Sequence, residues 1–183
     1  MQKTAWRKIG LAALVLVLFV SGACMAATNN DWSGAKAKYV FLFIGDGMGL
    51  QQIIAADVYR SSINAAGSTP ELKKMEISSF PVQGMVTTYS ANSFITDSAP
   101  AATTLASGYK TDNGVIGMDP SKTKKLVTVA QMARDKGMKV GVLTSVSLNH
   151  ATPASFYASQ PSRNDYYEIG EQLVDSGFDY FAG

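Results

Sequence analysis

Apolar residues follow two different spacings along this chain, and the two spacings alternate. Short continuous apolar runs rich in β-branched and aromatic residues predict buried strands, whereas apolar residues three and four positions apart predict helices. The predicted strands are Lys38–Ile44, Val82–Tyr89, Lys139–Ser145 and the beginning of one at Phe178–Phe181. The predicted helices are Gln51–Arg60, Ala99–Ala106, the segment Leu126–Ala133 and Asp165–Ser176. This alternation predicts an α/β fold, a three-layer sandwich with a largely parallel central sheet.

The first 26 residues have the pattern of a secretory signal peptide. Three basic residues precede the apolar run Ile9–Val20, and small residues allow cleavage after Ala26. The run is shorter than the ~20 apolar residues that span a bilayer, so an uncleaved anchor is the weaker alternative. We therefore expect a polar leader at residues 27–37, a domain from residue 38 to residue 183, and export to the periplasm or the medium. No transmembrane span is expected after signal cleavage.

Cys24 is the only cysteine and lies inside the predicted signal peptide, so the mature chain has no internal disulfide. An alternative is that the signal peptide is processed as that of a lipoprotein, with a lipid attached at Cys24. However, Ser21 stands where a lipoprotein signal usually has an aliphatic residue. Removing the signal also removes three basic residues and leaves 13 basic against 14 acidic ones. This balance argues against nucleic-acid binding.

Ser98 follows the β-prone stretch Phe94–Ile95 and precedes small residues that favour a helix. Its hydroxyl is therefore predicted at a helix N-terminus, where unpaired N–H groups and the helix dipole favour an anion such as a phosphoryl group. An Asp or Ser at this place is also a common N-cap, and for an isolated Asp97-Ser98 pair that simpler interpretation is preferred.

Asp46 ends the predicted strand Lys38–Ile44 in the run Gly45-Asp46-Gly47-Met48-Gly49. Ligands of open α/β sheets bind at the carboxyl ends of strands, and a carboxylate between glycines approaches a hard cation without crowding. The glycines are equally compatible with a tight turn between a strand and a helix.

Taken together, these segments resemble the alkaline phosphatase family. The resemblance rests on Phe43–Gly49 around Asp46, on Thr96–Ala99 with Ala102–Thr104 and Ser107-Gly108 around Ser98, and on Val142–Ser145 with Asn149–Ala154. Arg163 follows His150 at the spacing of the family's phosphate-binding arginine. The family's chains are much longer, so the resemblance implies that this chain is the N-terminal portion of an exported alkaline phosphatase, either a truncated product or a fragment.

The resemblance implies the hydrolysis of small-molecule phosphate monoesters through a phosphoserine intermediate, with two Zn²⁺ and one Mg²⁺ as cofactors. It implies that Ser98 is the nucleophile activated by zinc, and that Asp46 bridges a zinc and the magnesium. It also implies that Thr152 is a magnesium ligand and that the complete protein is a homodimer. Arg163 would clamp the phosphate, and Asp97 would orient that arginine. His150 belongs to the magnesium side, and imidazole binds Mg²⁺ poorly. We therefore expect His150 either to act through another ligand or to shift the metal preference of the site toward zinc or cobalt.

This chain has too few metal-binding side chains for the implied metal ions. A single histidine, His150, is too few for two zinc sites, so the activity of the 183-residue chain by itself is doubtful. Two alternatives stay open: a related phosphodiesterase or sulfatase of the same superfamily, or a catalytically inactive exported fragment. The sulfatase motif Cys/Ser-x-Pro-x-Arg is absent around Ser98, and phosphodiesterases commonly use threonine as the nucleophile and lack the clamping arginine.

Overall fold

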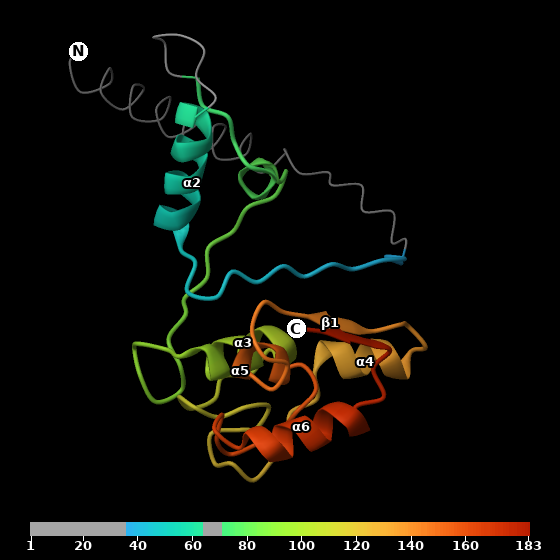
Figure 1. Ribbon diagram of the computed structural model, residues 1–183. Coiled ribbons are helices and arrows are strands. Elements are labelled where there is room, and N and C mark those ends of the chain that lie inside the picture. Colours follow the sequence, from blue (N-terminus) through green and yellow to red (C-terminus); the bar gives the residue numbers. More distant parts are fainter. Residues whose placement is uncertain (1–35, 64–70) are drawn as a thin grey trace, which may run out of the picture. The chain divides into compact units, whose positions relative to one another are not determined.

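The computed structural model describes residues 36–63 and 71–183. The chain divides between Phe43 and Ile44 into two units. The second unit holds the regular elements, which follow in this order: α2 (Leu50–Ile63), a 3-10 turn (Glu76–Ser79), α3 (Ser98–Ser107), α4 (Val129–Asp135), β1 (Gly141–Leu143), α5 (Ala151–Ala154), α6 (Tyr166–Asp175) and β2 (Tyr180–Ala182) (Figure 1). The predicted signal peptide lies outside the described residues and stays a prediction.

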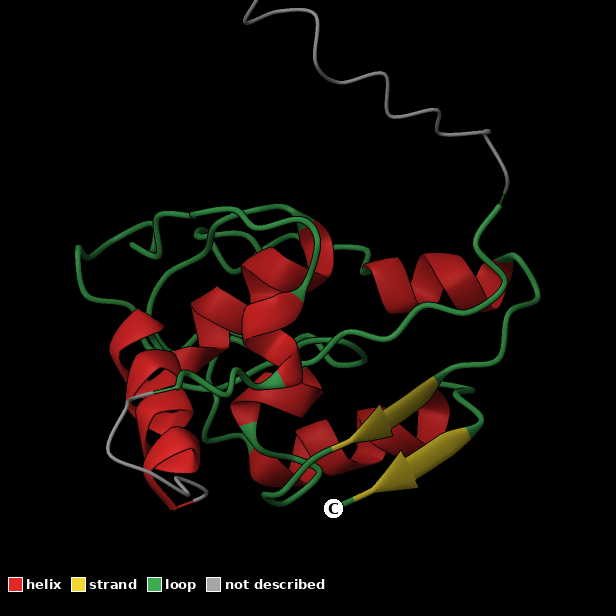
Figure 2. Cartoon of the chain, turned by 90° about the horizontal axis from the view of Figure 1, so that it is seen from above, coloured by secondary structure: helices red, strands yellow, loops and turns green. Residues whose placement is uncertain are grey.

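Strands β1 and β2 form a parallel pair, shown in yellow in Figure 2, with α5 and α6 in the connection between them. Gly141 lies opposite Tyr180, and Leu143 lies opposite Ala182. The Asp179 carboxylate accepts hydrogen bonds from Lys139 Nζ at 2.7 Å and Val140 N at 2.9 Å, which joins the beginnings of the two strands. Helices around a small parallel sheet confirm the predicted α/β class.

Helices begin and end where local chemistry satisfies their free backbone groups. Asp97 caps α3 by accepting from Ala99 N, and Gly108 ends it at φ +78°, a conformation that glycine adopts without strain. Thr128 and Gln131 form a reciprocal capping box at the start of α4. The box explains why this helix begins at Val129 and not at Leu126, the first residue of the predicted apolar pattern.

The core lies where α3, α5 and α6 meet. Its buried residues are small aliphatic side chains together with a few larger ones: Ala99, Ile116, Ala151, Ala154, Tyr157, Ala158 and Ile169. Leu173, Phe178 and Phe181 pack against this group, and the rings of Tyr157 and Phe181 meet edge to face with centroids 5.5 Å apart. Alanines on α3 and α5 allow these two helices to approach closely, which matters because both carry predicted site residues.

The strands predicted at Lys38–Ile44 and Val82–Tyr89 are wrong for this structure. Neither segment is a strand, and the apolar side chains of both are largely exposed: Phe41 is 79% exposed and Met85 fully so. An apolar run becomes a strand only when its backbone N–H and C=O groups pair with a neighbour. The described residues give neither segment such a neighbour. The third predicted strand is confirmed only in its middle, as β1.

No helix among the described residues is long and apolar enough to cross a membrane.

Candidate active site

Asp46 accepts one hydroxyl on each of its two carboxylate oxygens. Ser98 Oγ donates to Oδ1 at 2.9 Å, and Thr152 Oγ1 donates to Oδ2 at 2.7 Å. These partners lie 52 and 106 residues away along the chain, so the contacts are entirely a product of folding. Three oxygen groups of the kinds that bind hard cations thereby meet at one carboxylate.

The turn that carries Asp46 is short and rich in glycine. Met48 N donates to Gly45 O at 3.1 Å, and Gly47 has φ +67°, which a residue with a side chain rarely adopts. The turn leads directly into α2, and Gly49 N donates to the Gln52 side chain at 2.9 Å. The glycines therefore do form a tight turn, and the same turn leaves the Asp46 carboxylate exposed. The role of Asp46 as a cation ligand stays a prediction.

Asp97 has two partners for a single oxygen. Its Oδ1 accepts from Ala99 N at 2.7 Å as the N-cap of α3, and it also lies 3.2 Å from Arg163 Nη1. The cap and the predicted arginine partner are thus the same carboxylate. Because the cap fixes the Asp97 side chain beside Ser98, the ion pair brings the Arg163 guanidinium to the N-terminus of α3, where an anion is favoured.

Arg163 is also held through its backbone and through His150. Its backbone N donates to Gly114 O at 2.7 Å, and its Nη2 lies 3.4 Å from His150 Nε2. The guanidinium has five N–H groups in one plane, so some of these donors remain for a second partner beyond Asp97 and His150. The exposed fraction of its side chain is 24%, which is less than expected for a surface loop arginine.

His150 precedes α5 and faces two environments. Nε2 lies toward Arg163, while Nδ1 is buried without a hydrogen-bond partner among the described residues. The loop before it is tied down by Tyr157, whose hydroxyl donates to Leu148 O at 2.6 Å. Burial raises the pKa of Tyr157, which keeps this donor protonated.

The six predicted residues therefore form two groups of contacts, Thr152–Asp46–Ser98 and Asp97–Arg163–His150. The chain joins the two groups, because Asp97 directly precedes Ser98. The sequence analysis missed the contribution of Gly114, whose carbonyl holds the Arg163 backbone. A backbone acceptor leaves no side-chain signal, although the run Asp112-Asn113-Gly114 does indicate a turn.

The donor set fits part of a metal centre. The oxygens of Asp46, Ser98 and Thr152 are of the kind that Mg²⁺ prefers, and the Asp46 carboxylate is also of a kind that binds Zn²⁺. No group of three or more His, Cys, Asp or Glu side chains lies close enough to hold a metal ion within residues 36–63 and 71–183. The described residues thus offer the oxygen ligands but not a full zinc coordination shell.

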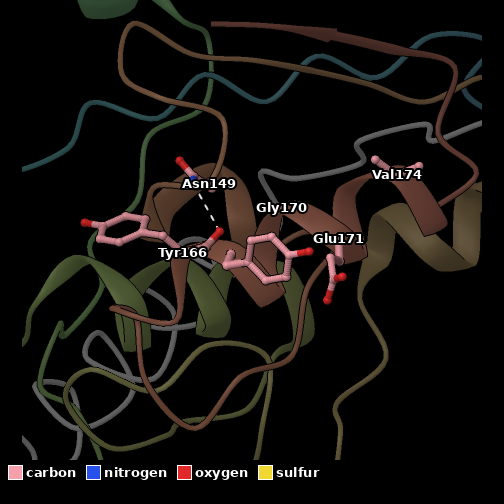
Figure 3. Close-up of a pocket in the computed structure, with 6 residues that line it drawn as sticks. Asn149, Tyr166, Gly170, Glu171 and Val174 are labelled. Atoms are coloured by element: carbon pink, nitrogen blue, oxygen red, sulfur yellow. Dashed lines mark hydrogen bonds between the residues drawn. The ribbon is translucent and has the colours of Figure 1, made fainter.

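A separate shallow pocket of about 420 Å³ lies along α6, lined by Asn149, Tyr166, Tyr167, Gly170, Glu171 and Val174 (Figure 3). Asn149 Nδ2 donates to Tyr166 O at 3.2 Å across its edge, as the dashed line in Figure 3 shows. Asn149 precedes His150 in the chain, but none of the six predicted site residues lines this pocket. The candidate site is therefore defined by its converging polar groups and not by this cavity.

Comparisons with known proteins identify the family of this chain. The family model for alkaline phosphatase matches residues 37–179. Alkaline phosphatase 4 of Drosophila melanogaster is 34% identical over 159 residues, which cover 84% of this chain and 26% of that protein. The match thus spans about a quarter of that relative's length.

Two solved structures give the same result. The cold-active alkaline phosphatase of a psychrophilic Shewanella species aligns with a TM-score of 0.65 and 37% identity, covering 75% of this chain and 33% of that one. A histidine-to-aspartate mutant of the alkaline phosphatase of the Antarctic bacterium TAB5, with magnesium bound in its M3 site, aligns with a TM-score of 0.59 and 32% identity, covering 70% and 35%. The chain belongs to the alkaline phosphatase family.

Proposed function

We propose that the full-length protein hydrolyses phosphate monoesters through a phosphoserine intermediate at Ser98. The observation that supports this most directly is the meeting of Ser98 Oγ with Asp46 at 2.9 Å beside an arginine that Asp97 anchors at 3.2 Å. A nucleophile, a carboxylate and a planar cation thus stand together at a helix N-terminus. This set of groups suits attack on a phosphoryl group.

The reaction follows in two displacements. The Ser98 oxygen forms a bond to phosphorus and gives its hydroxyl proton to water. The bond from phosphorus to the ester oxygen breaks, and that oxygen leaves with the electron pair and takes up a proton from water. Water then attacks phosphorus, and the bond between phosphorus and Ser98 Oγ breaks. Inorganic phosphate forms, and the proton released by the attacking water restores the Ser98 hydroxyl. Arg163 binds two non-bridging oxygens in both steps, because its planar fork matches them, and Asp97 keeps that fork oriented. The first-turn N–H groups of α3 favour the same charge.

We propose two Zn²⁺ and one Mg²⁺ as the cofactors. Asp46 and Ser98 would contribute to a zinc site, and Asp46 and Thr152 to the magnesium site, while His150 stands close to Arg163 without binding magnesium directly. When bound, such ions lower the pKa of a coordinated hydroxyl and neutralise phosphate oxygens. The magnesium in the TAB5 relative supports a metal-dependent protein.

We attribute the activity to a chain of the length of the relatives, because the described residues lack a cluster of metal-binding side chains. The substrates would be small phosphate monoesters, and the protein would work outside the cytoplasm as a homodimer. Purified residues 27–183, supplied with zinc and magnesium, should not hydrolyse an aryl phosphate. Metal-dependent turnover by that segment, free of host phosphatase, would contradict the attribution.

The experiment that tests the function is Ser98→Ala in the full-length protein. The variant should lose most of its activity and all phosphoserine trapped at low pH, while it still binds inorganic phosphate. Ser107→Ala is the matched control, because Ser107 lies at the other end of α3 and its hydroxyl donates within the helix, to Thr103 O at 2.7 Å. Label on another residue, or turnover by Ser98→Ala, would show that the nucleophile is wrong.

A further inference from the structure

Two buried hydroxyl groups lie between the helices that carry the site. Thr103 on α3 and Ser155 at the end of α5 are both 0% exposed, and Thr103 Oγ1 donates to Ser155 Oγ at 3.3 Å. Burying a hydroxyl costs free energy unless it finds a partner. A valine and an alanine would fill the same spaces, so these two hydroxyls must be explained by what they bind.

The two hydroxyls form a directional chain of hydrogen bonds. Gly117 N donates to Thr103 Oγ1 at 3.0 Å, Thr103 donates to Ser155, and Ser155 Oγ donates to Ala151 O at 2.8 Å, with Ala99 O farther away at 3.4 Å. Each hydroxyl therefore both donates and accepts. Successive hydrogen bonds in a dry interior strengthen one another, so this chain restrains direction as well as distance.

The ends of this chain of hydrogen bonds reach three elements that position site residues. Ala99 follows Ser98, and Ala151 precedes Thr152. On the other side, Gly117 belongs to the segment in which Ile116 exchanges two hydrogen bonds with Gln160, at 3.0 and 2.9 Å, and Gly114 holds the Arg163 backbone at 2.7 Å. One pair of buried hydroxyls thus joins the nucleophile helix, the Thr152 turn and the loop of Arg163.

Gly117 makes the connection rigid. It has φ +57°, and a Cβ at this position would overlap the backbone oxygen of Ala158. A side chain there would force the two backbone segments apart, and the N–H group would move away from Thr103. The close approach fixes the Gly117 N–H toward α3.

We propose that Thr103 and Ser155 are positioning residues that set the placement of Ser98, Thr152 and Arg163 relative to one another. The inference rests on the proposed function. Misplacement of a reacting group by about 1 Å costs as much as 100-fold in rate, so a loss of direction in this chain has a measurable effect on turnover.

The test compares Thr103→Val, which keeps the shape and removes the hydroxyl, with Thr103→Ser, which keeps the hydroxyl. In the full-length protein, at a temperature where every variant is folded, Thr103→Val should lower kcat/KM for an aryl phosphate roughly tenfold and weaken inhibition by inorganic phosphate. Thr103→Ser should stay within about twofold of the wild type. Ser107→Ala, the helix-internal hydroxyl on the same α3, should not change kcat/KM.

Ser155→Ala gives a second and milder variant, because Ser155 N still donates to Ala151 O at 3.0 Å and the turn keeps its backbone bond. It decides the question if Thr103→Val does not fold. A lower melting temperature with unchanged kcat/KM and phosphate inhibition would show that the pair is merely structural, and equal losses in Thr103→Ser and Thr103→Val would show that the hydroxyl is not the cause. Activity in Ser98→Ala would instead overturn the proposed function.

Discussion

Ser98 and Asp46 share one hydrogen bond but lie in very different surroundings. Ser98 begins a helix whose next residue, Ala99, is 0% exposed and belongs to the core. Asp46 lies on an exposed glycine turn, flanked by Ile44 at 37% and Met48 at 41% exposure. One side of the site is therefore built into packed structure, whereas the other is held by hydroxyl contacts to Ser98 and Thr152.

This difference predicts that substitutions on the packed side and on the Asp46 turn have different effects on stability. Removing a side chain from the packed side changes both the core and the reaction, because its neighbours are buried. We expect the removal of a group from the Asp46 turn to change the proposed reaction and not the stability, because little apolar surface depends on this turn.

Asp46→Asn should have the largest effect on activity with the smallest effect on stability, because Asp46 lies on the exposed turn and not in the packed part of the site. An amide accepts only on its oxygen, so one of the two hydroxyls loses its acceptor, and the negative charge that favours a cation is gone. We expect kcat/KM of the full-length protein to fall roughly 100-fold or more, with little change in melting temperature. Asp57→Asn is the control, since Asp57 is buried on α2 and accepts from Met75 N at 2.7 Å. If the two variants melt equally early, the Asp46 turn is structural.

Arg163→Ala removes a group that the packed side holds in place. A preorganised charge partner is worth about 3 kcal/mol, or roughly 100-fold in kcat/KM, and bound metals would mask part of that effect in kcat. Inhibition by inorganic phosphate should weaken. The kcat/KM for a phosphate diester should fall less than that for a monoester, because a diester has one fewer charged oxygen. Arg134→Ala removes a structural contact to Asp135 and should leave kcat/KM for both the monoester and the diester unchanged. Equal losses on monoester and diester would argue against a phosphate clamp.

Ile169→Ala and Met85→Ala measure the same contrast in stability. Ile169 is 0% exposed inside the core, so its truncation should cost about 2 to 5 kcal/mol of unfolding free energy. Met85 is fully exposed, so the same truncation should stay within about 0.5 kcal/mol. Urea denaturation of the 183-residue chain gives both values. A large loss for Met85→Ala would mean that the 82–89 segment packs in solution.

Acid should destabilise the fold through carboxylates away from the site. Hydrogen bonds lower the pKa of Asp57, chiefly from Met75 N, and of Asp179, chiefly from Lys139. A carboxylate with a lowered pKa stabilises the folded state above its ordinary value of 3.8, and this contribution is lost as the pH falls through the folded pKa. Asp179→Asn should flatten the fall in melting temperature below about pH 4. An unchanged pH profile in that variant would exclude the Lys139 pair as a cause.

Much of this site follows from local sequence. The turn at Asp46, the helix after Ser98 and the helix after Arg163 each depend on residues within a few positions, because caps, glycine turns and helical hydrogen bonds join near neighbours. The predicted helices at Ala99–Ala106 and Asp165–Ser176 are confirmed as α3 and α6 with small changes at their ends. The resemblance of the motifs to alkaline phosphatases is confirmed by the family comparison.

Only the tertiary structure decided which of these local pieces meet. The ion pair of Asp97 with Arg163 joins residues 66 positions apart, and only the family resemblance, not any local pattern, predicted it. The bond between Thr103 and Ser155 joins residues 52 apart, and nothing in the sequence predicted it. The strand predictions at Lys38–Ile44 and Val82–Tyr89 were wrong for the same reason. A helix satisfies its backbone within itself, whereas a strand requires a distant partner, and an apolar pattern does not say where that partner lies.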